Sequence, residues 1–269
     1  MTRSEAILEA VSLRKVFHTG GVFSRKEVIA ADDVSLALRP RHAVALVGQS
    51  GSGKSTVIRM LAKLYDPTAG AILYEGEDVT TKRKRRDIFD YRSKVQMIFQ
   101  DPFGSLNSTQ KIDYHLRRPL RLHGKVKNAR DERLRIGELL ERVSLTPVDE
   151  FAKKYPHQLS GGQRQRVAIA RALAIEPRVI LADEPVSMLD VSIRISILNL
   201  LIKLRDEENI AFLFVTHDLS SARYFSDEIL IMHKGKIVER GVSAEVIENP
   251  QDDYTRLLLS SIADPSRVF

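Results

Sequence analysis

One stretch of the chain combines glycines, a lysine and a hydroxyl residue at a spacing that suits phosphate binding. Gly48-Gln49-Ser50-Gly51-Ser52-Gly53-Lys54-Ser55 fits the pattern G-x-x-x-x-G-K-[ST] in full. Glycines let the backbone wrap an anion with its N–H groups pointing inward, and a helix that follows offers its positive N-terminus. Lys54 is then expected on the β- and γ-phosphates and the Ser55 hydroxyl on Mg²⁺. The predicted members of this nucleoside triphosphate site are Gly48, Gln49, Ser50, Gly51, Ser52, Gly53, Lys54, Ser55 and Thr56.

Two adjacent carboxylates end a second apolar stretch. Val179-Ile180-Leu181-Ala182 runs directly into Asp183-Glu184-Pro185. At the carboxyl end of a strand, Asp183 can hold Mg²⁺ and Glu184 can polarise an attacking water. When such a pair stands alone, a solvated turn is the default interpretation. The phosphate loop in the same chain favours the catalytic interpretation.

A second helix start has the composition of an anion site. Leu159-Ser160-Gly161-Gly162-Gln163-Arg164-Gln165-Arg166 sets a serine and two glycines in front of a stretch that is expected to be helical to about residue 175. A plain N-cap with a flexible approach is the alternative interpretation.

The elements around these motifs predict an α/β fold. Residues 7–17 and 28–38 alternate apolar and polar side chains, as half-buried antiparallel strands do. Residues 110–175 carry little strand pattern and predict a helical insertion. Strands interleaved with helices indicate a mostly parallel sheet with the active residues at its carboxyl edge. The remaining strands are expected at 43–47, 72–74, 95–99, 179–182, 211–215, 228–232 and 236–239, and further helices at 55–64 and 131–143.

The composition excludes several classes of protein. The 269 residues include no cysteine, and 42 Lys+Arg against 35 Asp+Glu give a net charge of +7. Without cysteine there is no disulfide, thiolate zinc site or cysteine nucleophile. No run of 18 apolar residues occurs, and the opening Met1–Glu5 leads into no long apolar stretch, so neither a transmembrane helix nor a secretory signal is expected. The basic run Lys82–Arg86 is expected to be a solvated loop or an exposed helix start, with nucleic acid or anionic lipid as the alternative.

Further motifs identify a family. Gln100 ends the strand at 95–99, Ser187-Met188-Leu189-Asp190 follows the acidic pair, and Val215-Thr216-His217-Asp218 closes another apolar run. With the phosphate loop and residues 159–166, they resemble the nucleotide-binding subunits of ABC transporters over nearly the whole chain. They match that family's Q-loop, D-loop, switch-histidine loop and signature. Phe17 is where an aromatic side chain usually stacks on adenine, although a single Phe is otherwise expected in the core.

The resemblance implies a fold and a division of the chain. The fold is that of a P-loop NTPase (RecA-like), with a mostly parallel core sheet, an antiparallel β subdomain and an inserted α-helical subdomain. One nucleotide-binding domain then spans 1–269. Residues 1–100 and 176–240 form the ATP-binding core, 101–175 the helical signature subdomain, and 241–269 a short C-terminal helical extension.

The resemblance also implies roles for single residues. Two cassettes pair head to tail in this family, so Ser160, Gly161, Gly162, Gln163 and Asp190 are expected to contact ATP held by a partner chain. The implied cofactors are ATP and Mg²⁺, with Ser55, Gln100 and Asp183 at the metal. The implied catalytic set is Glu184, His217, Gln100 and Lys54.

The implied partners follow from the same resemblance. They are a second, related ATPase chain in a heterodimer, two transmembrane permease subunits and, indirectly, an extracytoplasmic solute-binding protein; nucleic acid is not expected. The implied location is peripheral, on the cytoplasmic face of the inner membrane.

A narrower resemblance concerns the transported solute. Val95–Asn107, Tyr155–Gln158 and Glu248–Thr255 are similar to the oligopeptide/dipeptide permease subfamily, whose His-Pro is Asp252-Asp253 here. That subfamily serves peptides, nickel, glutathione and some oligosaccharides, so the solute stays open.

Two other classes of protein fit less well. A soluble ABC ATPase of DNA repair or translation is motivated by Lys82–Arg86, but residues 54–160 hold no sustained heptads and the chain carries one cassette. A P-loop kinase gives no reason for the signature stretch.

Overall fold

The computed structural model describes residues 6–19 and 26–263, so the prediction about Met1–Glu5 lies outside the described residues. The strands are β1 (Leu8–Thr19), β2 (Lys26–Leu38), β3 (Ala43–Val47), β4 (Ala69–Tyr74), β5 (Glu77–Asp78), β6 (Val95–Ile98), β7 (Val179–Asp183), β8 (Ala211–Thr216), β9 (Glu228–His233) and β10 (Lys236–Val242). The helices are α1 (Lys54–Leu61), α2 (Arg85–Lys94), α3 (Pro102–Ser105), α4 (Ile112–Leu122), α5 (Ala129–Arg142), α6 (Val148–Lys153), α7 (Gly161–Leu173), α8 (Val191–Glu208), α9 (Leu219–Phe225), α10 (Ser243–Glu248) and α11 (Asp253–Ala263), with a 3₁₀ turn at Pro156–Gln158.

Two sheets carry the β structure. The larger has six strands in the order β10-β9-β3-β8-β7-β6, and all neighbours pair in parallel except β10 with β9. The smaller has the order β2-β1-β4-β5 and is antiparallel. The predicted combination of a mostly parallel core with an antiparallel β part is therefore confirmed.

The register of the larger sheet sets its strand ends level. Val47 of β3 pairs with Thr216 of β8, and Val215 pairs with Asp183 of β7. Ala182 pairs in turn with Ile98 of β6. The loops that follow these four strands consequently emerge side by side at one edge of the sheet, where parallel α/β sheets bind ligands.

The central strands β3, β7 and β8 of the larger sheet are buried along their whole length, as their apolar sequences predict. Along β3, Ala43, Ala45 and Val47 join a core with residues of the helical part of the chain. Val44 and Leu46 point to the opposite face and pack with α1 and the antiparallel sheet. Successive side chains of a strand point to opposite faces of the sheet, so β3 contributes alternate residues to two hydrophobic cores.

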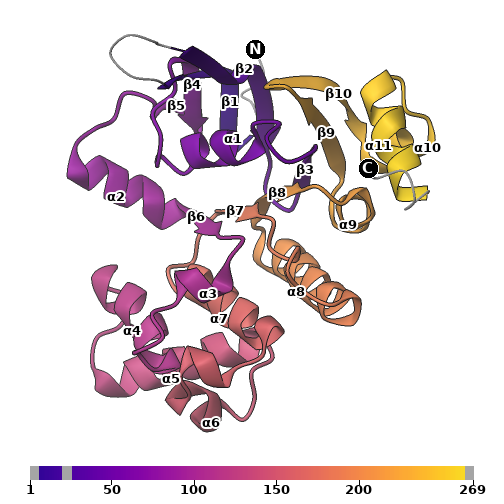
Figure 1. Ribbon diagram of the computed structural model, residues 1–269. Helices are drawn as coiled ribbons and strands as arrows, with labels where there is room; N and C mark the ends of the chain where they lie inside the picture. Colours follow the sequence, from indigo (N-terminus) through magenta and orange to yellow (C-terminus); the bar gives the residue numbers. More distant parts are fainter. Residues whose placement is uncertain (1–5, 20–25, 264–269) are drawn as a thin grey trace.

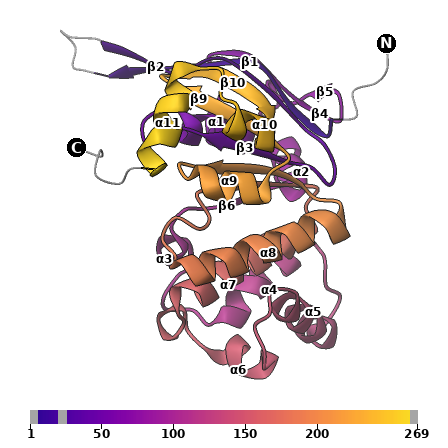
Figure 2. The ribbon, with the colours of Figure 1, turned by 90° about the vertical axis from the view of Figure 1, so that its right-hand side faces the viewer.

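The helices from α3 to α7 gather in a lobe of their own below the sheets (Figure 1). α8 lies between this lobe and the core, and α10 and α11 lie beside β9 and β10 (Figure 2). Every element between β6 and β7 is helical, as the sequence predicts for 110–175. The domain boundaries at 100, 175 and 240 stay a prediction.

The first helix, α1, ends earlier than predicted. The helix expected over 55–64 spans Lys54–Leu61. Lys63 adopts a left-handed φ of 56° and its ammonium donates to the carbonyls of Val79 and Thr80. The chain leaves the helical conformation where Lys63 makes these contacts. They join the end of α1 to residues 79–80, a contact that the local sequence pattern does not predict.

No helix in the described ranges is long and apolar enough to cross a membrane.

Candidate active site

The phosphate loop joins β3 to α1 at the carboxyl edge of the sheet. Gly53 precedes the helix with a φ of 110°, which L side chains rarely adopt. A Cβ on Gly53 would lie 2.0 Å from the Ala30 carbonyl oxygen of β2. Only glycine fits between the loop and the antiparallel sheet, so the loop keeps the backbone path that the motif predicts.

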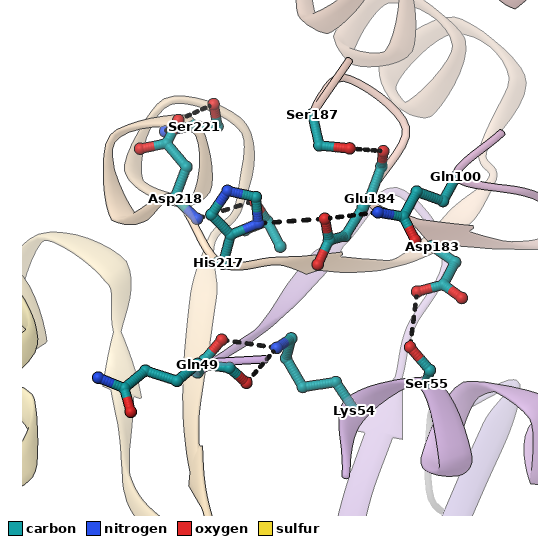
Figure 3. Close-up of polar contacts among 12 residues, drawn as sticks. Gln49, Lys54, Ser55, Gln100, Asp183, Glu184, Ser187, His217, Asp218 and Ser221 are labelled. Carbon is teal, nitrogen blue, oxygen red and sulfur yellow. Dashed lines mark hydrogen bonds and ion pairs between the residues drawn. The ribbon is translucent and has the colours of Figure 1, made fainter. Parts of the chain in front are cut away.

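Lys54 is buried and aimed into the loop. Lys54 is only 4% exposed. Its Nζ donates to the carbonyls of Gly48 at 2.6 Å and Gln49 at 2.9 Å (Figure 3). Burial lowers the pKa of Lys54, while the carboxylates of Glu184 and Asp183 act to raise it. Phosphate oxygens around Nζ would stabilise the charged ammonium that burial disfavours.

Ser55 and Asp183 come together from α1 and β7. The Ser55 hydroxyl donates to Asp183 Oδ1 at 3.4 Å. Burial raises the pKa of the Asp183 carboxyl, and Arg59 counteracts the rise. One hydroxyl and one carboxylate beside a phosphate site are the donors that Mg²⁺ takes when it binds together with nucleotide phosphates. These residues therefore fit the metal that the sequence predicts.

Glu184 lies at the centre of a polar cluster formed by three strand ends. Gln100 Nε2 donates to Glu184 Oε2 at 3.2 Å, and His217 Nδ1 lies 3.1 Å from the same oxygen (Figure 3). The Glu184 backbone is left-handed with a φ of 46°, and its amide donates to Val215 of β8 at 2.9 Å. A strained backbone held by neighbours on both sides fixes the direction of the carboxylate.

A cleft of about 760 Å³ opens above these residues, within the size range of small-molecule sites. It unites the phosphate loop with the Glu184 cluster. Its lining residues are Val28, Ile29, Ala30, Gln49, Ser50, Gly51, Gly53, Lys54, Ser55, Thr56, Gln100, Glu184, His217, Leu219 and Leu258.

The signature residues do not line this cleft. Ser160 caps α7 in a reciprocal box, in which the Gln163 amide donates to Ser160 Oγ at 3.3 Å and the Ser160 amide donates to Gln163 Oε1 at 3.0 Å. Gly162 packs so closely on α8 that a Cβ would lie 2.5 Å from Ile193 Cγ2. Asp190 is exposed at the start of α8. The N-cap interpretation holds within the chain, and contact with a partner's ATP stays a prediction.

Phe17 also lies outside the lining of the cleft. Its ring packs edge-on against Tyr65 with centroids 5.7 Å apart, and the Lys15 ammonium lies 5.2 Å from its centroid. Phe17 pairs with Val28 across the two strands, and Val28 does line the cleft. The stacking of Phe17 on adenine stays a prediction.

Two residues of α11 contribute to the site without having been predicted there. The Tyr254 hydroxyl accepts the Gln49 amide of the phosphate loop at 3.1 Å, and Leu258 lines the cleft. Nothing in the local sequence marks this contact, since the two partners of the hydrogen bond are 205 residues apart.

The fold and the site define the class: a P-loop nucleoside triphosphatase. A glycine-rich loop at a helix start, a buried lysine, a hydroxyl–carboxylate pair and a fixed glutamate supply positioning and charge neutralisation, which is what phosphoryl transfer to water requires.

Comparison with known proteins narrows the class to a family. Residues 31–187 match the ABC transporter family. The chain is 44% identical over 262 residues to the oligopeptide transport ATP-binding protein OppF of Streptococcus mutans, covering 97% of this chain and 83% of that protein. It is 45% identical over 251 residues to the glutathione import ATP-binding protein GsiA of Salmonella typhimurium, covering 92% of this chain and 40% of that protein.

A solved structure agrees with this likeness. The dimeric post-hydrolysis state of the ATP-binding cassette MJ0796, bound to ADP and Pi, superposes with a TM-score of 0.77 at 30% identity, covering 88% of this chain and 98% of that one. The chain belongs to the ATP-binding proteins of ABC transporters, which are ATPases.

Proposed function

We propose that this chain is the ATP-hydrolysing subunit that powers import of a peptide or related small polar solute through separate transmembrane permease subunits. The observation that carries the chemistry is the Glu184 carboxylate, held by Gln100 and His217 in the same cleft as Lys54. The solute class rests on the printed functions of two relatives, oligopeptide transport and glutathione import.

Binding of ATP is the task of the phosphate loop. Lys54 exchanges its two carbonyl partners for β- and γ-phosphate oxygens, and the N–H groups at the start of α1 face the same phosphates. Ser55, Asp183 and Gln100 would hold Mg²⁺, which supplies charge neutralisation to the phosphates.

Hydrolysis is the task of the Glu184 cluster. Glu184 polarises the attacking water and takes up its proton at the carboxylate. Gln100 and His217 hold that carboxylate from two sides, so the water is aligned without further movement of the side chain. His217 lines the same cleft and would also contact the γ-phosphate. The water attacks the γ-phosphorus directly, the bond from that phosphorus to the bridging oxygen breaks, and ADP leaves with that oxygen. No group of the protein becomes covalently modified.

A second cassette would complete the ATP site of this chain with its own signature and D-loop residues. In return, Ser160, Gly161, Gly162, Gln163 and Asp190 of this chain would contact the ATP held by that cassette. Ser160 is exposed. Met188 of the D-loop is 58% exposed, and Val191 and Ile195 of the following helix α8 are 68% and 47% exposed. Large apolar side chains exposed together mark an interaction surface. The MJ0796 cassette is dimeric in its ADP-bound state. We propose a related second chain as the partner, giving a heterodimer.

A groove beside Gln100 supports docking of a permease. It measures about 650 Å³ and lies between β6 and α7, and it includes Phe99, which is 41% exposed. Gln100 lines both this groove and the ATP cleft. A permease segment seated here would therefore touch the residue that holds Glu184. We propose that docking at this groove holds the chain as a peripheral protein on the cytoplasmic face of the membrane. An extracytoplasmic solute-binding protein would be an indirect partner, through the permease.

The basic run gives little support to a nucleic-acid function. Lys82 pairs with Glu77 at 2.7 Å, and Arg83 pairs with Asp66 at 3.0 Å. Neighbouring acids thus neutralise part of the run, as in an ordinary solvated surface.

Uptake by intact cells tests the proposal. Cells that lack the chain are complemented with the parental gene or with Glu184→Gln, and entry of labelled di- and oligopeptides and of labelled glutathione is measured. We expect uptake of at least one of them to return with the parental chain and to stay absent with the variant. Equal uptake of every probe in the complemented and uncomplemented cells would contradict the proposal.

A further inference from the structure

The C-terminal helix α11 reaches the nucleotide site from outside the ATP-binding core. It lies beside β9 and β10 (Figure 2), and its Leu258 is buried at the rim of the ATP cleft. One turn earlier, the Tyr254 hydroxyl accepts the Gln49 amide at 3.1 Å. Gln49 belongs to the phosphate loop, and its carbonyl is one of the two partners of Lys54. A single loop residue thus links α11 to the phosphate-binding lysine.

Tyr254 is itself held firmly. Its ring lies on the His233 ring at the end of β9, with centroids 3.9 Å apart and planes inclined at 35°. The chain just beyond β9 also contacts the phosphate loop, because the Gly235 amide donates to the Ser52 carbonyl at 2.9 Å. The end of β9 therefore supports both the loop and the tyrosine that binds it.

The start of α11 is anchored on the far side by β10. The Glu239 carboxylate accepts the amide of Gln251 at 2.8 Å and that of Asp252 at 3.1 Å. Asp252 Oδ1 accepts the Tyr254 amide at 2.9 Å, and Thr255 is fully buried. These contacts fix where the helix starts, and hence where the Tyr254 hydroxyl lies.

We propose that Tyr254 is a positioning residue of the nucleotide site, through which α11 holds the first turn of the phosphate loop in the form that receives ATP. The inference rests on the proposed ATPase function. The Tyr254 hydroxyl accepts the Gln49 N–H, and this hydrogen bond fixes the orientation of that peptide group. The amides that follow in the loop can then point toward the phosphates. A loop ordered before the nucleotide arrives loses less conformational freedom on binding.

The matched substitutions are Tyr254→Phe and Tyr114→Phe. The first removes only the hydroxyl that accepts from the Gln49 amide at 3.1 Å. The second removes a hydroxyl that accepts from Arg118 Nη1 at the same 3.1 Å, in α4 of the helical lobe. Both keep the ring, so packing is nearly unchanged.

ATP hydrolysis by the full chain in its purified complex is then measured against ATP concentration. We expect Tyr254→Phe to raise KM about two- to tenfold with kcat nearly unchanged, the range for loss of one hydrogen bond. Tyr114→Phe should keep both parental values. A parental KM in Tyr254→Phe, with or without a lower melting temperature, would overturn the proposal and leave Tyr254 a purely structural residue.

Amide hydrogen exchange of the full chain without nucleotide gives a second readout. We expect the Gln49 amide to exchange faster in Tyr254→Phe than in the parental chain, and at the parental rate in Tyr114→Phe. Equal exchange in all three chains would contradict the proposed link.

Lys54→Ala separates this inference from the proposed function. If Lys54→Ala abolishes ATP binding while Tyr254→Phe behaves as the parental chain, only the role of Tyr254 is wrong. If Lys54→Ala binds ATP as the parental chain does, the assignment of the nucleotide site itself is wrong.

Discussion

At the scale of single residues, the chemistry depends on one carboxylate that three strand ends hold in place. Glu184 follows β7, His217 follows β8 and Gln100 follows β6, and the register of the sheet makes these ends level. The acidic pair at the end of an apolar strand, together with the phosphate loop, could predict Glu184, and the resemblance to the ABC transporter motifs could predict Gln100 and His217. They could not predict Tyr254, because its role arises from a contact between segments distant along the chain.

Replacing Glu184 by glutamine tests the assignment of the base. Glutamine has the same shape but cannot accept the proton of the water, so we expect kcat to fall at least about a hundredfold. ATP affinity should be nearly unchanged, because Lys54 and the loop remain. Glu207→Gln, on an exposed face of α8, is the control and should keep parental turnover. Parental hydrolysis by Glu184→Gln would show that another group activates the water.

Asp183→Asn tests the metal assignment. The neutral amide removes the negative charge beside Ser55, so the Mg²⁺ concentration for half-maximal hydrolysis should rise at least about tenfold. Binding of ATP in the presence of a chelator should not change, which separates loss of metal from loss of nucleotide. An unchanged Mg²⁺ dependence would remove Asp183 from the metal site.

At the scale of elements, packing between helices decides what the motifs leave open. The sequence predicts that α7 begins at the signature, and Ser160 and Gln163 form the cap that such a start needs. It does not reveal that Gly162 lies against Ile193 of α8, since that contact depends on how two helices cross. For the same reason α1 ends earlier than its apolar pattern suggests, where Lys63 turns toward Val79 and Thr80.

Alanine substitutions at adjacent glycines test this packing. A Cβ at Gly162 would meet Ile193 at 2.5 Å, whereas one at Gly161 would lie at an ordinary 3.5 Å from Leu189. We expect Gly162→Ala to destabilise the fold by about 1–3 kcal/mol and to lower its melting temperature by several degrees. Gly161→Ala should melt close to the parental chain, and Ile193→Ala should recover part of the loss in Gly162→Ala. Equal melting of both single variants would contradict the close approach of α7 and α8.

At the scale of the whole molecule, the phosphate loop and the signature residues lie on different parts of the surface of the chain. The phosphate loop opens at the edge of the sheet, while the capped start of α7 belongs to the helical lobe (Figure 1). The signature residues line no part of the cleft that holds Lys54. Head-to-tail pairing of two such chains would bring unlike halves together, and a single chain cannot reveal the partner's half.

Ser160→Arg tests that pairing. A bulky cation at the exposed start of α7 should block the approach of a second cassette, while the phosphate loop of the same chain stays intact. In the Glu184→Gln background and with the related second cassette present, we expect size-exclusion chromatography with ATP to lose the peak of the two-cassette dimer, while nucleotide binding by this chain persists. Loss of ATP binding by the isolated chain would show instead that Ser160 acts within its own site.

The central claim is that the chain drives a transporter, and the most direct measurement is its isolation from native membranes. The tagged chain is purified in mild detergent, and its companions are identified by mass spectrometry. We predict two transmembrane permease subunits and a second ATP-binding cassette. Recovery from the soluble fraction only, alone or with nucleic acid, would contradict the transport function and leave an ATPase of another kind.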